Sequence, residues 1–169
     1  RDVGKLNVLW LQSCGCGGCS LSLLNADTAD FHGQLRDAGV NLLWHPSLSL
    51  ESGAELIELL DRCLDGRLRL DALCIEGAVL RGPNGTGRFH MLAGTGRPMM
   101  DWIQRLSGVA THVLAMGSCA AWGGITAGGS NPTDACGLQY DNVHRGGLLG
   151  ADFVAKGGLP VINVAGCPT

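Results

Sequence analysis

Apolar positions along the chain gather into five short runs, over residues 5–12, 40–46, 70–79, 111–119 and 159–167. Within each run the apolar side chains are nearly continuous and do not alternate with polar ones. This pattern is typical of strands covered on both faces, as in a parallel sheet between two layers of helices. We therefore predict five buried strands at these positions.

The clearest amphipathic helix between these runs begins at Ser52 and ends at Gly66. Ser52 and Glu55 have the spacing of a capping box, and several leucines share one face of the segment with Cys63. Because that face would pack against the sheet, we predict that Cys63 is a core residue.

Three further segments are candidate helices. Residues 98–108 start at a proline and end at a glycine, and weaker helical patterns follow Cys19 and cover residues 147–156. Strands and helices that alternate along a chain predict a parallel sheet with helices on both faces. The expected fold class is therefore α/β, a flavodoxin-like three-layer domain with a central parallel sheet.

Length and charge narrow the range of functions. A chain of 169 residues suits one domain with a proper core. Its 12 basic and 15 acidic residues give a net charge of −3 without a basic patch, so no nucleic-acid partner is expected. No apolar stretch approaches the roughly 20 residues that span a bilayer, and no signal peptide is visible. We expect a location in the cytoplasm or at the cytoplasmic face of a membrane.

The eight cysteines are the most informative residues. Disulfides are the less favoured interpretation, because the apolar content is ample for a core without covalent staples. Cys63 and Cys74 lie inside strongly patterned segments and are interpreted as core residues. The other six lie in glycine-rich or loop contexts, which favours binding of a metal.

Four of these cysteines are predicted to meet at one edge of the sheet. The carboxyl ends of parallel strands form the edge at which ligands bind in such folds. The first strand leads to the C-x-x-C pair Cys16 and Cys19, the fourth to Cys119 and the fifth to Cys167, while the third ends at Glu76. An iron–sulfur cluster is the favoured ligand of this arrangement, and zinc or a redox pair of thiols are the alternatives.

Three further residues near this edge leave alternatives open. Cys14 is expected to be a packed thiol and Cys136, in a turn-rich loop, an unligated one. Glu76 follows an apolar run, where a carboxylate costs several kcal/mol unless it is paired or protonated. It is either a structural carboxylate that accepts backbone N–H groups or a carrier of protons.

The motifs "CGGCS", "CIEGAV", "GSCAAWGGI" and "INVAGCPT", in this order, make the chain resemble the small, electron-transferring subunit of nickel–iron hydrogenases. Within that family it is most similar to the uptake-type branch of cyanobacteria and related aerobic bacteria. The resemblance implies that Cys16, Cys19, Cys119 and Cys167 ligate the proximal iron–sulfur cluster, of the 4Fe-4S type or alternatively 3Fe-4S. It also implies that Glu76 lies near the proton route at the subunit interface.

The resemblance carries expectations about the assembly as well. The nickel–iron centre would lie only in a separate large subunit, in an obligate heterodimer or a higher oligomer built from it. Electrons would leave through the cluster toward a respiratory acceptor whose identity is left open. Residues 1–169 would form the flavodoxin-like domain, whereas the second, multi-cluster domain of the family is absent from this sequence.

Two departures from the family pattern concern the C-x-x-C segment. Leu21 stands where the family usually has a glutamate, and Gly18 stands where some oxygen-tolerant relatives have an additional cysteine. Two other functions remain as alternatives. One is the iron–sulfur subunit of a quinone reductase complex, which would carry two adjacent cysteines, and the other is a zinc-stabilised binding module.

Overall fold

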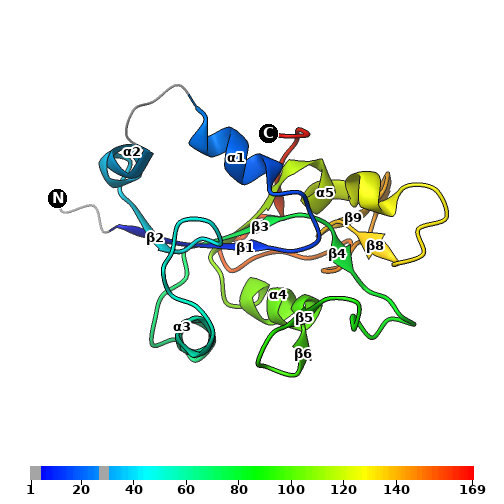
Figure 1. Ribbon diagram of the computed structural model, residues 1–169, viewed down its shortest axis with the longest axis horizontal. Helices are drawn as coiled ribbons and strands as arrows, with labels where there is room; N and C mark the ends of the chain where they lie inside the picture. The colour runs from blue at the N-terminus through cyan, green and yellow to red at the C-terminus, as the bar shows by residue number, and fades with distance from the viewer. Residues whose placement is uncertain (1–4, 27–30) are drawn as a thin grey trace.

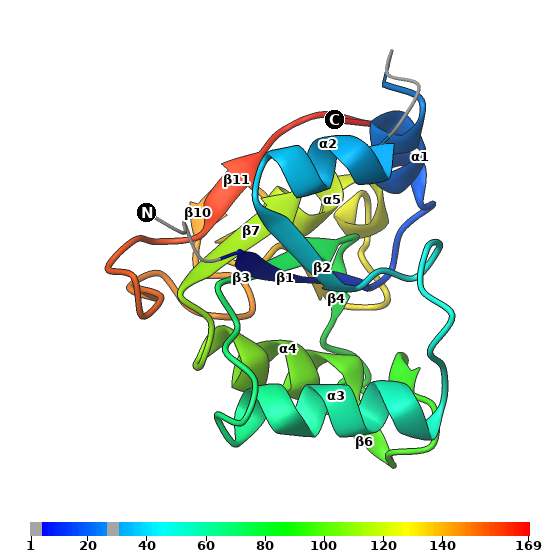
Figure 2. The same cartoon turned by 90° about the vertical axis from the view of Figure 1, so that its left-hand side faces the viewer.

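The computed structural model describes residues 5–26 and 31–169. Within these residues, five parallel strands form the central sheet in the order β2-β1-β3-β7-β11 (Figures 1 and 2). Their bounds are Val40–Trp44 for β2, Leu6–Gln12 for β1, Ala72–Glu76 for β3, His112–Met116 for β7 and Ile162–Val164 for β11. This is the strand order of flavodoxin-like folds. The five predicted strands and the predicted α/β class are confirmed.

Helices cover both faces of the sheet (Figure 2). One face carries α3 (Ala54–Leu64) and α4 (Met99–Ser107), and the other carries α1 (Gly18–Leu24), α2 (Phe31–Asp37) and α5 (Gly117–Trp122). The helices predicted after Cys19 and over residues 98–108 are therefore confirmed. None of the helices in the described parts of the chain is long and apolar enough to cross a bilayer.

Helix α3 confirms the predicted core position of Cys63 but not the predicted capping box. Cys63 is buried together with the leucines of the same face. The N-cap residue is Gly53, and no side chain of the described residues caps the helix. The Ser52 carbonyl instead accepts the Glu55 N–H at 3.2 Å, so Ser52 lies in the turn before the helix and is too early to act as its cap.

The helix predicted over residues 147–156 is wrong, because this segment consists of turns. Its backbone N–H groups bond to a distant part of the chain: Leu148 donates to Gly137 and Leu149 donates to Leu138. Gly147 also has a left-handed φ of 59°, which interrupts a helical path. Long-range backbone pairing therefore replaces the local hydrogen bonds of a helix.

Short antiparallel pairs and one 3-10 turn lie among the connections, mostly beyond the carboxyl ends of the main strands (Figure 1). The pairs are β4 (Val79–Leu80) with β8 (Ala135–Cys136), β5 (Met91–Leu92) with β6 (Arg97–Pro98), and β9 (Tyr140–Asp141) with β10 (His144–Arg145). The 3-10 turn, η1 (Gly124–Ala127), follows α5 directly. The sequence pattern did not predict these elements, since two-residue strands carry no periodicity.

Candidate metal centre

A cavity of about 220 Å³ lies at the carboxyl edge of the sheet. All four predicted ligands, Cys16, Cys19, Cys119 and Cys167, line it, and so does Glu76. The thiols come from three separate connections: the β1–α1 turn, helix α5 after β7, and the segment after β11. The structure thus brings together every site residue that the sequence predicted.

The β1–α1 turn is positioned by a backbone extension of the sheet. Ser13 N–H donates to the Glu76 carbonyl at 2.7 Å, and Cys14 and Ala78 exchange two backbone hydrogen bonds. Gly77 lies against this turn with a left-handed φ of 92°, and a Cβ there would be 2.8 Å from the carbonyl carbon and oxygen of Cys14. Glycine at this position therefore permits the close approach of the two backbones that sets Cys16 at the cavity.

The other two connections are tied to each other. Ser118 N–H, at the start of α5, donates to the Gly166 carbonyl at 2.8 Å, so the segments that carry Cys119 and Cys167 are held side by side. A Cβ on Gly117 would collide with the sulfur of Cys19, and a Cβ on Gly124 would lie 2.7 Å from the sulfur of Cys119. Backbone thus approaches the sulfurs closely enough to exclude any side chain from these positions.

The pKa of the Cys119 thiol is influenced by the three other cysteines of the cavity. Burial raises the pKa of its thiol, and negative charge on the three other cysteines raises it further. A hydrogen bond from the Ile125 N–H to the sulfur lowers the pKa and only partly offsets these effects. Thiolates at all four positions would repel one another unless a positively charged group lay between them.

The geometry fits an inorganic cluster better than a single ion. Over residues 5–26 and 31–169, no three His, Cys, Asp or Glu side chains are placed to share one metal ion. Zinc holds its thiolates at about 2.3 Å, so four zinc ligands would crowd around a single point. Four thiols spread around a cavity of about 220 Å³ fit the larger iron–sulfur cluster, which takes one thiolate at each iron of a cubane.

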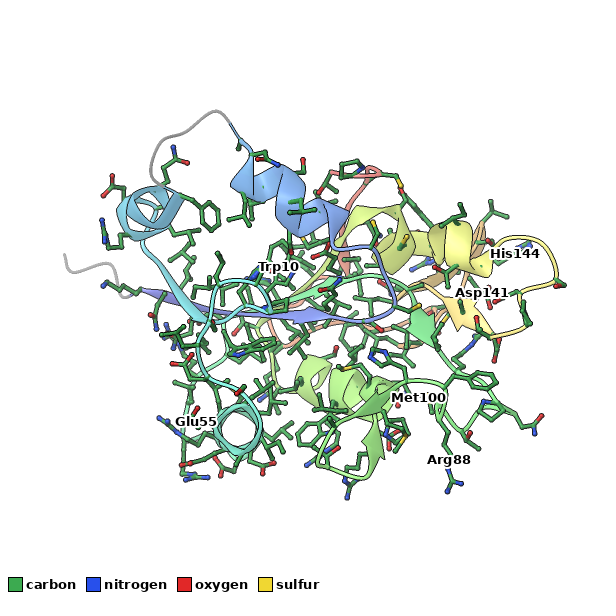
Figure 3. The ribbon with its side chains drawn as sticks, viewed as in Figure 1. Trp10, Glu55, Arg88, Met100, Asp141 and His144 are labelled. Carbon is green, nitrogen blue, oxygen red and sulfur yellow. The ribbon has the colours of Figure 1, made fainter. Side chains whose placement is uncertain are left out.

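Glu76 forms the floor of this site. Its side chain is 2% exposed, and both carboxylate oxygens accept hydrogen bonds. Cys19 N–H donates at 3.0 Å and Ser20 N–H at 3.2 Å to Oε1, while the Ser20 hydroxyl donates at 2.5 Å and Trp10 Nε1 at 3.1 Å to Oε2. Trp10 lies on the α1 side of the sheet (Figure 3). These contacts are those of a structural carboxylate, and a role as proton carrier stays a prediction.

Sequence analysis missed His45, which belongs to the same edge of the sheet. It follows β2, is 1% exposed, and its Nε2 lies 3.1 Å from the Ser20 hydroxyl. The available signal was its position near the carboxyl end of the predicted strand 40–46, where side chains reach the ligand-binding edge.

The other four cysteines lie outside the cavity wall. Cys63, Cys74 and Cys136 are buried, and burial raises the pKa of their thiols to about 11, 12 and 11. Cys14 is partly buried in its bridge with Ala78. The core positions of Cys63 and Cys74 are confirmed. Cys136, predicted to be an unligated thiol in a turn-rich loop, lies in the short strand β8 and in the core. All eight cysteines are free in the structure.

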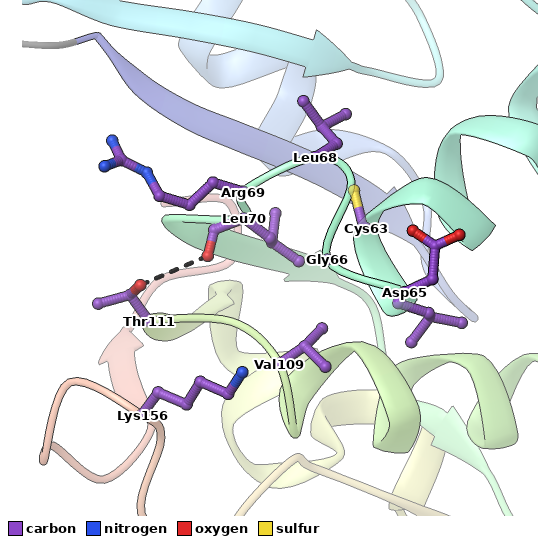
Figure 4. A pocket seen from close by; sticks show the side chains of 10 residues that line it. Cys63, Asp65, Gly66, Leu68, Arg69, Leu70, Val109, Thr111 and Lys156 are labelled. Carbon is purple, nitrogen blue, oxygen red and sulfur yellow. Dashed lines mark hydrogen bonds between the residues drawn. The ribbon is translucent and has the colours of Figure 1, made fainter.

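A larger cavity, of about 600 Å³, opens at the opposite, amino edge of the sheet (Figure 4). Cys63 lines it, but its buried thiol is a poor source of thiolate. Arg69 also lines it and pairs with Asp71 at 2.9 Å. The wall lacks the grouped thiols of the smaller cavity, which is therefore the candidate site.

Comparison with known proteins places the chain in a family. The family model described as "NADH ubiquinone oxidoreductase, 20 Kd subunit" matches residues 16–169. The chain belongs to this family. Its matched region begins at the first predicted ligand, Cys16, and includes all four.

Curated proteins similar to this chain are hydrogenase small subunits. The chain is 28% identical to the F420 non-reducing hydrogenase I small subunit of Methanosarcina mazei, covering 99% of this chain and 46% of the relative. It is 31% identical to the hydrogenase-2 small chain of Escherichia coli K12, covering 95% of this chain and 38% of the relative. The chain therefore spans less than half the length of these relatives.

Solved structures lead to the same group. An actinobacterial-type NiFe-hydrogenase from Ralstonia eutropha H16 matches with a TM-score of 0.80 and 29% identity, over 99% of this chain and 50% of that one. The [NiFeSe] hydrogenase from Desulfovibrio vulgaris Hildenborough matches with a TM-score of 0.80 and 28% identity, over 99% and 56%. The resemblance to small subunits of nickel–iron hydrogenases is confirmed.

Proposed function

We propose that this chain is the cluster-bearing domain of the small subunit of a nickel–iron uptake hydrogenase. Electrons from H2 oxidation in a large subunit would leave through an iron–sulfur cluster toward a respiratory acceptor. The observation that carries the proposal is the convergence of Cys16, Cys19, Cys119 and Cys167 on one cavity. The similarity to hydrogenase small subunits supports it.

The four cysteines would hold the cluster, of the 4Fe-4S type or alternatively 3Fe-4S, as thiolates. When bound, the cluster supplies a site that accepts and releases single electrons. The Ile125 N–H donates to the Cys119 sulfur, and hydrogen bonds to cluster sulfurs are one of the factors that set the reduction potential. Met116 and Pro168 line the same cavity and give it an apolar wall beside the thiols.

A large-subunit partner is proposed to cover the mouth of the cavity. Cys16 and Cys167 are both exposed there, and Ile125, next to the Cys119 sulfur, is 89% exposed. Exposed apolar side chains around a redox site are typical of an interface with a protein partner. An obligate interface of this kind buries more than about 2,000 Å².

The cysteine spacing favours this function over the two alternatives. A quinone reductase subunit would present adjacent cysteines, whereas Gly17 and Gly18 separate Cys16 from Cys19 here. A zinc module would need four sulfurs around one ion, and the described side chains are not placed for that.

Co-purification with the large subunit tests the proposed interface. We expect Ile125→Asp to prevent assembly, because it places a charge within the proposed apolar contact. Val154→Asp is the matched control, since Val154 is 56% exposed and precedes β11, at the opposite edge of the sheet. Light scattering should show a heterodimer for wild type and Val154→Asp. A stable, cluster-loaded monomer of the wild-type chain would contradict the proposal.

A further inference from the structure

A buried chain of hydrogen bonds leads from His45 to the C-x-x-C segment. The Ser47 N–H donates to His45 Nδ1 at 3.1 Å, so this nitrogen is an acceptor. In a neutral imidazole the proton then lies on Nε2, which is 3.1 Å from the Ser20 hydroxyl. Burial lowers the pKa of His45, against the opposing effect of the Glu76 charge, and this favours the neutral ring. His45 is therefore a donor toward Ser20.

The Ser20 hydroxyl connects His45 to Glu76 through two hydrogen bonds. Its hydroxyl accepts from His45 and gives its own hydrogen to Glu76 Oε2 at 2.5 Å. Trp10 Nε1 donates to the same oxygen at 3.1 Å, and the Trp10 ring lies beside His45 with a centroid separation of 5.2 Å. Two donors on one oxygen of the carboxylate fix its rotation.

The second oxygen of Glu76 holds the ligand segment. Oε1 accepts the N–H of Cys19 at 3.0 Å and that of Ser20 at 3.2 Å. Any rotation of the carboxylate would break these two bonds and release the backbone that carries the Cys19 sulfur. The position of Cys19 at the cavity therefore depends on contacts made on the far side of Glu76.

We propose that His45 and Ser20 are positioning residues: they fix the Glu76 carboxylate against the Cys19 N–H and so orient the Cys19 sulfur in the cavity. The inference deepens the proposed function and rests on it, because the oriented sulfur is a proposed cluster ligand. Residue 20 must carry a hydroxyl, since this group accepts a hydrogen bond from His45 and donates one to Glu76. Residue 45 must supply an N–H donor.

Variants at position 20, in the complex with the large subunit, separate this role from general packing. Ser20→Ala cuts the chain of hydrogen bonds, and Ser20→Thr keeps the hydroxyl. Ser107→Ala is the matched control, because Ser107 is 0% exposed in α4 and its hydroxyl has no hydrogen-bond partner among the described residues. The readouts are the cluster's EPR g-values, its midpoint potential in a redox titration, and hydrogen–deuterium exchange of the peptide spanning α1.

We expect Ser20→Ala to change the g-values, to shift the midpoint potential and to speed exchange in α1. Ser20→Thr and Ser107→Ala should match wild type in all three readouts. An unchanged EPR spectrum in Ser20→Ala, or an equal change in Ser107→Ala, would overturn the inference. A wild-type complex without a cluster would instead overturn the proposed function.

Substitutions of His45 keep the test decisive if Ser20→Ala does not assemble. His45→Phe keeps an aromatic ring but removes the donor, and His45→Gln keeps an N–H. We expect His45→Phe to change the EPR spectrum and the potential, and His45→Gln to stay closer to wild type. Equal effects of the two substitutions would show that the ring, and not its hydrogen bond, matters.

Discussion

Replacing a cysteine of the cavity should affect the cluster, whereas replacing a cysteine of the core should affect the stability of the fold. Burial raises the pKa of the Cys63 thiol to about 11, against an ordinary value of 9.0. Forming its thiolate would therefore cost about 3 kcal/mol more than forming an ordinary one. Cys119 lies among three other thiols, and its sulfur accepts the Ile125 N–H. Cys119 is placed to be a ligand, whereas Cys63 is placed to be packed.

We therefore expect Cys119→Ser to remove or convert the cluster, because it replaces one of four soft ligands by a weaker one at nearly the same volume. Cys63→Ala should keep the cluster and lower the free energy of unfolding by about 1 kcal/mol through lost packing. Iron content and EPR measure the first effect, and urea unfolding measures the second. Loss of the cluster in Cys63→Ala, with full retention in Cys119→Ser, would refute the reasoning.

Three further predictions concern the neighbourhood of the site. Gly77→Ala should lower the free energy of unfolding, measured in urea, by about 3 kcal/mol, because the alanine is strained in the left-handed region and overpacked. Gly39→Ala is the control: its φ is 71° and no described atom lies within 4 Å of the new Cβ, so it should lose only the part due to strain. An equal loss in the two variants would contradict the clash at Gly77. Glu76→Gln removes the titratable group, so H2 turnover per loaded cluster should fall; wild-type turnover would leave Glu76 a structural role alone. Because burial lowers the pKa of His45, its neutral form stabilises the fold above the unfolded value of about 6.5, and this stability is lost as the pH falls below that value. The free energy of unfolding, measured in urea at about pH 7.5 and 5.5, should therefore drop less for His45→Gln than for wild type. The lowered pKa of His90 keeps some pH dependence in both proteins. Identical drops in the two proteins would count against a contribution of His45.

The strands and the meeting of the cysteines were predictable because both follow from simple rules. A continuous apolar run indicates a strand buried on both faces, and parallel strands deliver their carboxyl ends to one edge. The cysteines needed only this rule, since each lies directly after a strand. The edge of the sheet that carries the site could therefore be predicted from the order of strands and helices alone.

The hydrogen bonds that organise the site could not be predicted in the same way. Ser20 and His45 are 25 residues apart, and their contact depends on where α1 and the end of β2 are placed in space. The turns at 147–156 likewise depend on pairing with residues 137 and 138. Local pattern carries no information on such long-range partners. The wrong capping role of Ser52 has a different cause: the helix begins one residue later than the pattern indicated, after Gly53.

The most direct test of the central claim is the metal and sulfide content of the chain purified anaerobically with its large subunit. The account predicts about four acid-labile sulfides per chain for a 4Fe-4S cluster, with about four irons in addition to the iron of the large subunit's nickel–iron centre. In Cys119→Ser or Cys167→Ser the sulfide and the cluster's share of the iron should fall together. One zinc per chain without sulfide would contradict the account.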